Sequence, residues 1–520
     1  MFASAVHQLR YAVGLLRGDR MPVESLTRIA RDLVATIREF GEPGEDSALL
    51  PGQQGTPDPD VRRTVLTRGL RLTARRAAAR TAYYRAMFAG LDIRPEELTL
   101  DSWTRLPVTP KAALRGMPAA FVAAGIEPAL VALTTGTSGT PTSVWLSRRE
   151  LDTLVALNTI SAVLSQRLRP GHVLAYAGSS RGTIPVICVG TAVPAVGAAF
   201  MHLGTLDPAV TLERLAAPLA LPGPPRQVTH LTANTSYLAA LVRAAERGGW
   251  RPADFGLRSV QVGGEALSDA LRVRARRAFG VEPEIGYMMT ESMPAGARLC
   301  SAGHLHHTTE FAHVEVLDPV THLPAAPGEI GTIVVTPLLP YRECTLLLRY
   351  VTGDLVRRLD TPPTCELAAV PATSDILGRY EGPLSLQVPH RQVLEILDAE
   401  PDVALPARYA LLPEPGGPVL HVLAEHRSPR LLARLEDAAT ARGLEVGGIV
   451  LHDEPDRMPP TPPLRADLRE HSFDHSVARR GRRPAALGAA TAAETTAGPL
   501  RPPANANGIG PAASPAGAPR

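Results

Sequence analysis

The chain has 520 residues, of which 45% are hydrophobic and 20% charged, with a formal net charge of +3. This length favours two or more domains around a large core. The near balance of charge argues against nucleic acid or an anionic membrane as an obligatory partner. Lys111 is the only lysine among the 54 Lys and Arg residues, which excludes catalysis by a lysine anywhere else.

Residues 1–75 are predicted to form a helical N-terminal extension, because Arg, Ala and Leu are abundant on both sides of a polar interruption at 41–60. From 76 to 378, short β-branched runs alternate with helical patterns, which favours a large α/β domain of layered sheets and helices. The predicted strands lie at 173–177, 259–262, 313–317 and 332–336. Ser147 and Glu150 have capping-box spacing for one helix, and a second is predicted from Ser268 to Gly280.

The uncharged run 182–206 is long enough to cross a bilayer, but Pro185, Gly190, Pro194 and Gly197 interrupt it. We therefore expect a buried strand and turn rather than a membrane span. The four cysteines are too few and too scattered for a disulfide scaffold. His7 and Arg10 interrupt any apolar leader. These features predict a cytoplasmic protein that contacts no membrane.

Residues 379–475 have the size of a small α+β domain, with a strand at 419–424 and a helix at 429–442. After residue 475 the chain has almost no large apolar residues, so 476–520 are predicted to be a disordered tail. The arginines within 479–483 are either a solvated charge run or a contact for an anionic partner.

Residues 133–142 read LTTGTSGTPT. Small residues let the backbone close on phosphate oxygens, and Thr and Ser add hydroxyl and amide donors. The same composition is common in plain turns, and the segment lacks the Gly-Lys-Ser/Thr ending of a Walker loop. By itself the loop does not decide a function.

Four further motifs follow in order: VGGEA at 262–266, GYMMTES at 286–292, RYVTGD at 349–354 and LGR at 377–379. Together with the loop, they resemble the adenylate-forming superfamily of acyl-CoA synthetases, and within it the phenylacetate-CoA ligase-like branch. Pieces similar to that branch are AYYR at 82–85, LPVTPK at 106–111, and GHLH at 303–306 after Cys300. The resemblance covers roughly residues 75 to 470.

The resemblance implies a large N-terminal adenylate-forming domain and a small mobile C-terminal domain. In the implied reaction, a carboxylate attacks the α-phosphate of ATP to give an acyl-adenylate and pyrophosphate, and a second nucleophile then displaces AMP. The residues implied to hold the phosphates are Thr134, Thr135, Gly136, Thr137, Ser138, Gly139 and Thr140. Glu291 would bind Mg²⁺, and Thr290 would donate to the α-phosphate.

The residues implied to contact adenosine are Gly263, Gly264, Glu265, Tyr287, Asp354 and Arg379. Tyr287 would stack on adenine, and the glycine turn would let the backbone approach the base edge. Asp354 would accept hydrogen bonds from both ribose hydroxyls, and Arg379 would lie at the ribose and the domain hinge. The alternatives are that the carboxylates are satisfied surface groups and that Tyr287 only packs in the core.

Two lysines that are usual in this family are replaced. Thr140 stands where the phosphate loop usually has lysine. Arg465 stands where a C-terminal lysine bridges the substrate carboxylate and the α-phosphate, so it is the third candidate catalytic residue beside Glu291 and Thr290. Arginine keeps the charge but is larger and planar, which puts the rate of adenylation in doubt. Lys111 lies far away in sequence, and we interpret it as structural.

Cysteine and histidine residues gather at 300–307, after the GYMMTES motif, and a further cysteine stands at 365. By resemblance to some relatives, Cys300, His306 and Cys365 fall on three positions of a structural zinc site. Zinc prefers four tetrahedral ligands, so His304, His307 or Glu366 would have to complete the set. Surface histidines and buried free thiols are the alternative.

The first hypothesis for function is an ATP- and Mg²⁺-dependent ligase that activates a small carboxylic acid and transfers it to coenzyme A, in bacterial specialised metabolism. An amine, a carrier-protein thiol or another small nucleophile is the alternative acceptor. A second hypothesis is a catalytically degenerate nucleotide-binding homologue, and a third is a scaffold acting through the basic tail. A modest aromatic or branched acid is expected as substrate, held by burial with a few polar anchors. A homodimer is left open.

Overall fold

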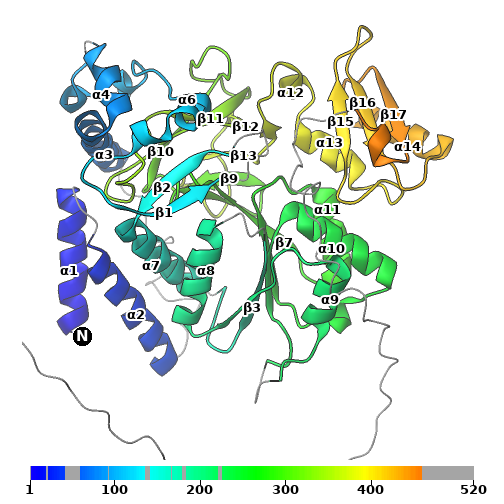
Figure 1. The fold of residues 1–520 in the computed structure, drawn as a ribbon, viewed down its shortest axis with the longest axis horizontal. Coiled ribbons are helices and arrows are strands. Elements are labelled where there is room, and N and C mark those ends of the chain that lie inside the picture. Colours follow the sequence, from blue (N-terminus) through cyan, green and yellow to red (C-terminus); the bar gives the residue numbers. More distant parts are fainter. Residues whose placement is uncertain are drawn as a thin grey trace, which may run out of the picture. The chain divides into compact units, whose positions relative to one another are not determined.

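The computed structural model describes residues 2–18, 22–40, 59–91, 93–134, 141–165, 167–178, 183–220 and 225–459. Within these residues the largest sheet has eight strands (Figure 1). Their order is β13 (Ala372–Ser374), β9 (His304–His307), β8 (Gly296–Leu299), β7 (Pro283–Met288), β6 (Ser259–Gly263), β5 (His230–Asn234), β3 (Val173–Ala177) and β4 (Ala199–His202). The strands from β7 to β4 pair in parallel, and the remaining pairs are antiparallel.

Helices cover both faces of the parallel strands (Figure 1). One face carries α9 (Pro208–Ala216), α10 (Thr235–Gly248) and α11 (Asp269–Phe279), and the other carries α7 (Arg148–Leu164) and α8 (Thr183–Val196). On the first face, Val260 and Val262 of β6 pack with Leu241 of α10 and Leu271 of α11 in a continuous apolar core. Because side chains alternate between the two faces, the residues on the opposite face of the same strands do not belong to this core.

A second sheet has four strands in the order β10 (Ala312–Leu317), β11 (Ile330–Pro337), β12 (Tyr350–Arg357) and β14 (Gly378–Arg379). The helices that share its core are α3 (Pro59–Arg80), α4 (Ala82–Ala89), α5 (Leu100–Trp103) and α6 (Lys111–Gly116). Buried Trp103 and Tyr350 belong to this core. The short helices η1 (Pro95–Glu97) and η2 (Pro118–Phe121) connect these elements.

The hairpin β1 (Pro128–Leu133) and β2 (Ser143–Ser147) leads into α7. Two N-terminal helices, α1 (Phe2–Arg17) and α2 (Val23–Phe40), precede this part. Val34 of α2 packs against Val163 of α7, so the N-terminal helices cover α7 rather than the sheet.

The C-terminal residues have a core of their own. Its strands are β15 (Tyr409–Leu412), β16 (Val419–Leu423) and β17 (Gly448–His452), and its helices are α12 (Leu384–Gln387), α13 (His390–Leu397) and α14 (Pro429–Ala441). The remaining 3-10 turns are η3 (Pro252–Asp254) and η4 (Pro455–Arg457). The small α+β part therefore follows the large α/β part, as predicted.

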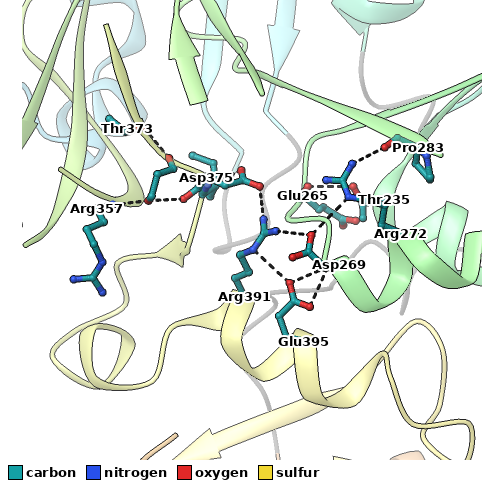
Figure 2. A network of polar contacts seen from close by, with 12 residues as sticks. Thr235, Glu265, Asp269, Arg272, Pro283, Arg357, Thr373, Asp375, Arg391 and Glu395 are labelled. Carbon is teal, nitrogen blue, oxygen red and sulfur yellow. Dashed lines mark hydrogen bonds and ion pairs between the residues drawn. The ribbon is translucent and has the colours of Figure 1, made fainter. Parts of the chain in front are cut away.

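A polar network ties α13 to α11 (Figure 2). Arg391 of α13 forms ion pairs with Asp375, Asp269 and Glu395. The Glu395 carboxylate also accepts hydrogen bonds from the backbone N–H of Asp269, at 2.8 Å, and of the residue after it, at 3.2 Å. Glu395 thus satisfies donors at the N-terminus of α11, where a negative charge is favourable.

The predicted strands in the first 378 residues, and the one at 419–424, are confirmed as β3, β6, β10, β11 and β16. The helix at 429–442 is confirmed as α14. Ser147 and Glu150 form the expected capping box of α7, and Gly280, with φ of 75°, ends α11. Helix α3 runs through residue 75, and the domain boundaries stay predictions. The tail at 476–520 lies outside the described residues.

The prediction of a strand and turn at 182–206 is wrong for most of that run, because 183–196 form α8 and only β4 is a strand. Pro185 lies in the first helical turn, where backbone N–H groups lack intrahelical partners anyway. Pro194 lies in the last turn, and Gly197 follows with φ of 91°. In the described part of the chain, no helix is long and apolar enough to cross a membrane.

Buried Glu150 joins α7 to the loop before β12, and its replacement tests the packing of these parts. Its carboxylate accepts from the N–H groups of Ser147 and Glu343, at 2.6 and 2.9 Å, and lies 3.4 Å from Arg342. Burial raises the pKa of Glu150, while the Arg342 charge opposes that shift. Glu150→Ala would leave Arg342 buried and unpaired, so we expect a loss of about 3 kcal/mol in unfolding free energy by denaturant titration.

The matched control for this variant is Glu96→Ala, which removes an exposed glutamate. It should change the unfolding free energy by less than about 0.5 kcal/mol. Equal stability of the two variants would contradict the role given to Glu150.

Candidate active site

A cavity of about 480 Å³ lies between the parallel strands and helices α7 and α8. Its lining includes Asn234, Gly263 and Gly286, which stand at one level near the carboxyl ends of β5, β6 and β7. Open parallel sheets bind ligands at this edge. The predicted site residues that line the cavity are Thr134, Gly263, Gly264, Thr290, Glu291 and Arg379.

Glu291 is buried at the cavity wall, with only 2% of its surface exposed. Its Oε1 accepts a hydrogen bond of 3.0 Å from the Tyr350 hydroxyl and lies 3.6 Å from Lys111 Nζ. Burial, and then the Glu291 charge, raise the pKa of Tyr350, so Tyr350 stays protonated and can donate. A buried carboxylate needs such partners because water no longer solvates it.

Lys111, which the sequence analysis interpreted as structural, is a further functional candidate because of its position at the cavity. It starts α6, and its side chain lines the cavity. Backbone bonds between Thr109 and both Arg349 and Val351, at 2.8 and 3.0 Å, attach the start of α6 to β12. The signal available in the sequence was that the only lysine of the chain ends the LPVTPK motif.

Three of the predicted motifs meet at Asp354. The Tyr287 hydroxyl donates to Asp354 Oδ2 at 2.8 Å, and Arg379 Nε donates to Oδ1 at 3.2 Å. Asp354 and Arg379 are direct neighbours across β12 and β14, while Tyr287 comes from β7. Burial, and then the Asp354 charge, raise the pKa of Tyr287, so its hydroxyl keeps the proton that it donates. Of the three, Arg379 lines the cavity.

The glycine turn after β6 brings the backbone close to β7. A Cβ on Gly263 would lie 3.2 Å from the carbonyl oxygen of Gly286, and Gly264 has φ of 84°, so both positions favour glycine. Glu265 has a structural role that the sequence did not indicate. Its carboxylate accepts from the Ser236 N–H at 2.6 Å, which caps the start of α10.

The predicted phosphate loop is the connection between β1 and β2. Thr134 Oγ1 accepts from the N–H of Thr142 at 2.9 Å, and the Thr134 N–H donates to the Thr142 carbonyl at 3.0 Å. These bonds close the hairpin at the cavity edge, where Thr134 lies. Residues Thr135, Gly136, Thr137, Ser138, Gly139 and Thr140, and also Arg465, lie outside the described residues.

Cys300, His304, His306 and Cys365 form a cluster whose ligand atoms all lie within 4.8 Å of one another. Cys365 Sγ lies 3.2 Å from His306 Nε2, and Cys300 Sγ lies 3.7 Å from His304 Nδ1. The other ring nitrogen of His306 donates to the Val370 carbonyl at 2.9 Å. That bond orients the imidazole so that Nε2 faces the cluster, as in metal sites.

The structure distinguishes among the three candidates for a fourth ligand. His307 Nε2 lies 3.1 Å from the Thr373 hydroxyl, and the Glu366 carboxylate accepts from Ser301 Oγ at 2.8 Å. His304 is therefore the residue that joins the three predicted ones. Two thiols and two imidazoles are a donor set that suits tetrahedral zinc.

Solved structures of 2-hydroxyisobutyryl-CoA ligase have a similar fold. The postadenylation state in complex with R3-HIB-AMP gives a TM-score of 0.63 at 17% identity, over 76% of this chain and 86% of that chain. This chain has the fold of an adenylate-forming ligase. The open conformation with 2-HIB-AMP and CoA gives a TM-score of 0.55 at 16% identity, over 77% and 92% of the two chains. No protein-family model and no curated protein matches the sequence.

The contact between Lys111 and Glu291 can be tested with the single lysine as a probe. Reductive ¹³C-methylation should label Lys111 and the N-terminal amine. Glu291→Gln removes the neighbouring charge, so we expect the Lys111 signal to move in NMR spectra. Glu284→Gln, a change in the same cavity lining, is the control and should leave it nearly unmoved. A Lys111 signal that ignores Glu291→Gln would place the ammonium elsewhere.

Proposed function

We propose that this protein activates a carboxylic acid with ATP, forming an acyl-adenylate, and transfers the acyl group to coenzyme A. The observation that carries the proposal is the meeting of separate motifs at one cavity, with the buried Glu291 and Lys111 side by side at its wall. The shared fold supports the proposal, because the ligase with this fold is described in complex with 2-HIB-AMP and CoA. The phenylacetate-CoA ligase-like branch stays part of the proposal.

In the proposed first step, a carboxylate oxygen forms a bond to the α-phosphorus of ATP, and the bond to pyrophosphate breaks. The step brings two anions together, so a cation at their meeting point lowers the barrier. Lys111 is placed to supply that charge in the described part of the site. Thr290, which also lines the cavity, would donate to an α-phosphate oxygen.

The residues present fit a magnesium ion, since Glu291 offers carboxylate oxygen at the cavity wall and Mg²⁺ prefers oxygen ligands. Glu291 would hold it, and the ion would offset phosphate charge when bound. Asp354 would accept hydrogen bonds from the ribose hydroxyls in place of the hydrogen bond from Tyr287. The Tyr287 ring would then be free to stack on adenine. The loop from Thr134 to Thr140 would hold the outer phosphates.

In the proposed second step, the CoA thiolate attacks the acyl carbon, and AMP leaves with the bonding electron pair. An amine or a carrier-protein thiol is the alternative acceptor. The small C-terminal part would rotate between the two steps about Gly378, whose φ is 146° and where a Cβ would lie 2.7 Å from that of His390. Rotation would break the ion pairs of Arg391 with Asp375 and Asp269 and bring Arg465 toward or away from the cavity. The cysteines at 188, 300, 344 and 365 form no disulfide within the described residues, which supports the proposed cytoplasmic location.

Acid-dependent exchange of pyrophosphate into ATP tests this function. We expect exchange with at least one acid of a broad aromatic and aliphatic panel. Lys111→Met should lower the exchange rate about 10²- to 10³-fold, because it removes one preorganised charge from the transition state. Arg94→Met, at an exposed position, is the control and should keep the rate.

Two variants of Arg465 test whether this residue replaces the missing C-terminal lysine. If Arg465 occupies the slot of the missing lysine, Arg465→Ala abolishes exchange and Arg465→Lys raises it. Exchange that is absent with every acid, from protein shown to be folded, would contradict the proposed function. AMP binding without exchange would then point to a nucleotide-binding homologue.

We also propose that Cys300, His304, His306 and Cys365 hold a structural Zn²⁺. The ion would join the β8–β9 hairpin to the segment before β13, at the antiparallel end of the eight-stranded sheet. β8 pairs directly with β7, which carries Tyr287 and leads to Glu291. Zinc would therefore stabilise the strand behind the proposed site without touching the substrates.

Elemental analysis of the purified protein tests the zinc site, and we expect about one zinc per chain. Cys365→Ser should lose the metal and about 2 kcal/mol of stability, which lowers Tm by about 3 °C for a domain of about 300 residues. Cys188→Ser, a change outside the cluster, should retain the zinc. Metal-free wild-type protein after growth with added zinc and purification without chelators would refute the site.

A further inference from the structure

On β5, β6 and β7 the cavity face of the sheet is polar, although helices cover it. Thr232 of β5 pairs with Gln261 of β6, and Gln261 with Glu284 of β7, and all three line the cavity. Residues that pair in neighbouring strands point to the same face. The opposite face of the same strands is the apolar core, so the polar row belongs to the cavity alone.

The register of the strands fixes how far the polar row of Thr232, Gln261 and Glu284 lies from the carboxyl ends of the strands. Asn234, Gly263 and Gly286 form the level near the strand ends, where the proposed adenylation takes place. Thr232 and Gln261 lie two residues earlier, which is about 7 Å deeper along the strands. With the carboxyl carbon of the acid at the level of the strand ends, a substituent about 7 Å from it would meet the hydroxyl and the amide.

Thr232 and Gln261 are available for a ligand. Both are half-buried, and neither side chain has a hydrogen-bond partner among the described residues. The facing wall combines polar residues of α7 and its C-cap, Asn158, Ser161 and Ser165, with an apolar stripe of α8, formed by Cys188, Val189, Ala192 and Val193. The space between them suits a flat or extended group with one polar edge.

The charges at the far end of the cavity are already paired. Arg167 Nη2 lies 2.8 Å from Glu284 Oε2. His230 bonds to the Arg167 carbonyl at 2.7 Å through Nε2 and to Thr229 Oγ1 at 2.8 Å through Nδ1. Burial lowers the pKa of His230, which favours its neutral form. A second charge on the substrate would meet no unpaired opposite charge here.

We propose that the substrate is a carboxylic acid with a neutral hydroxyl or amide group about 7 Å from its carboxyl carbon, bound by Gln261 and Thr232. This inference rests on the proposed function and names its substrate class. It narrows the expected modest aromatic or branched acid to one with a hydrogen-bonding substituent. Hydrocarbon acids of the same shape would leave both side chains unpaired, which a site of this kind disfavours.

Calorimetry with two stable acyl-adenylate mimics tests the proposal without turnover. The probes are the adenosine sulfamates of 4-hydroxyphenylacetate and 4-methylphenylacetate, which have nearly the same shape. We expect the hydroxyl compound to bind wild-type protein about tenfold more tightly, as one hydrogen bond allows. Thr232→Val with Gln261→Leu should abolish or reverse this preference. Gln8→Leu, an exposed change on α1, should keep it.

The outcomes separate this proposal from the function on which it rests. Equal or tighter binding of the methyl compound to wild type, or a preference that survives the double substitution, overturns the substrate class and leaves the proposed function standing. If neither compound binds to folded protein, the adenylate site itself is refuted, and the substrate class falls with it.

Discussion

Parallel pairing of β5, β6 and β7 is the constraint on which the rest of the site depends. Because side chains alternate between faces, the pairing that buries Val260 and Val262 in the core also turns Gln261 and Gly263 toward the cavity. A slip by one residue would exchange the two faces, so that both the apolar core and the cavity lining would be lost. Core and cavity are thus two consequences of one register.

The second requirement is the charge of Glu291. A carboxylate with 2% exposure is unstable without partners, and those partners come from distant segments. Tyr350 belongs to the four-stranded sheet, and Lys111 to the helix attached to its edge. The buried charge therefore links the two sheets at the point where the proposed chemistry occurs.

Much of the fold could be predicted because its signals are local. Alternating β-branched runs identified the strands, and Ser147, Glu150 and Gly280 marked helix ends through capping. The helix at 183–196 was missed because its prolines suggested a turn, whereas Pro185 lies in the first turn, where a helix tolerates proline, and Pro194 lies only in the last turn.

The site could be predicted only as far as its motifs extend. Asp354 and Arg379 are brought together by strand pairing, which motif order suggested but could not demonstrate. Lys111 and His304 required the structure, since nothing local to Lys111 indicates a carboxylate on another element, and His304 was one of three equivalent candidates. The availability of Gln261 depends on which face of β6 the core covers.

A crystal structure with AMP and Mg²⁺ is the most direct test of the central claim that this cavity is an adenylate site. The account predicts density for AMP at the carboxyl ends of β5, β6 and β7, with the ribose hydroxyls on Asp354 and the phosphate near Lys111 and Thr290. AMP bound away from this edge, or a phosphate turned away from Lys111, would contradict it.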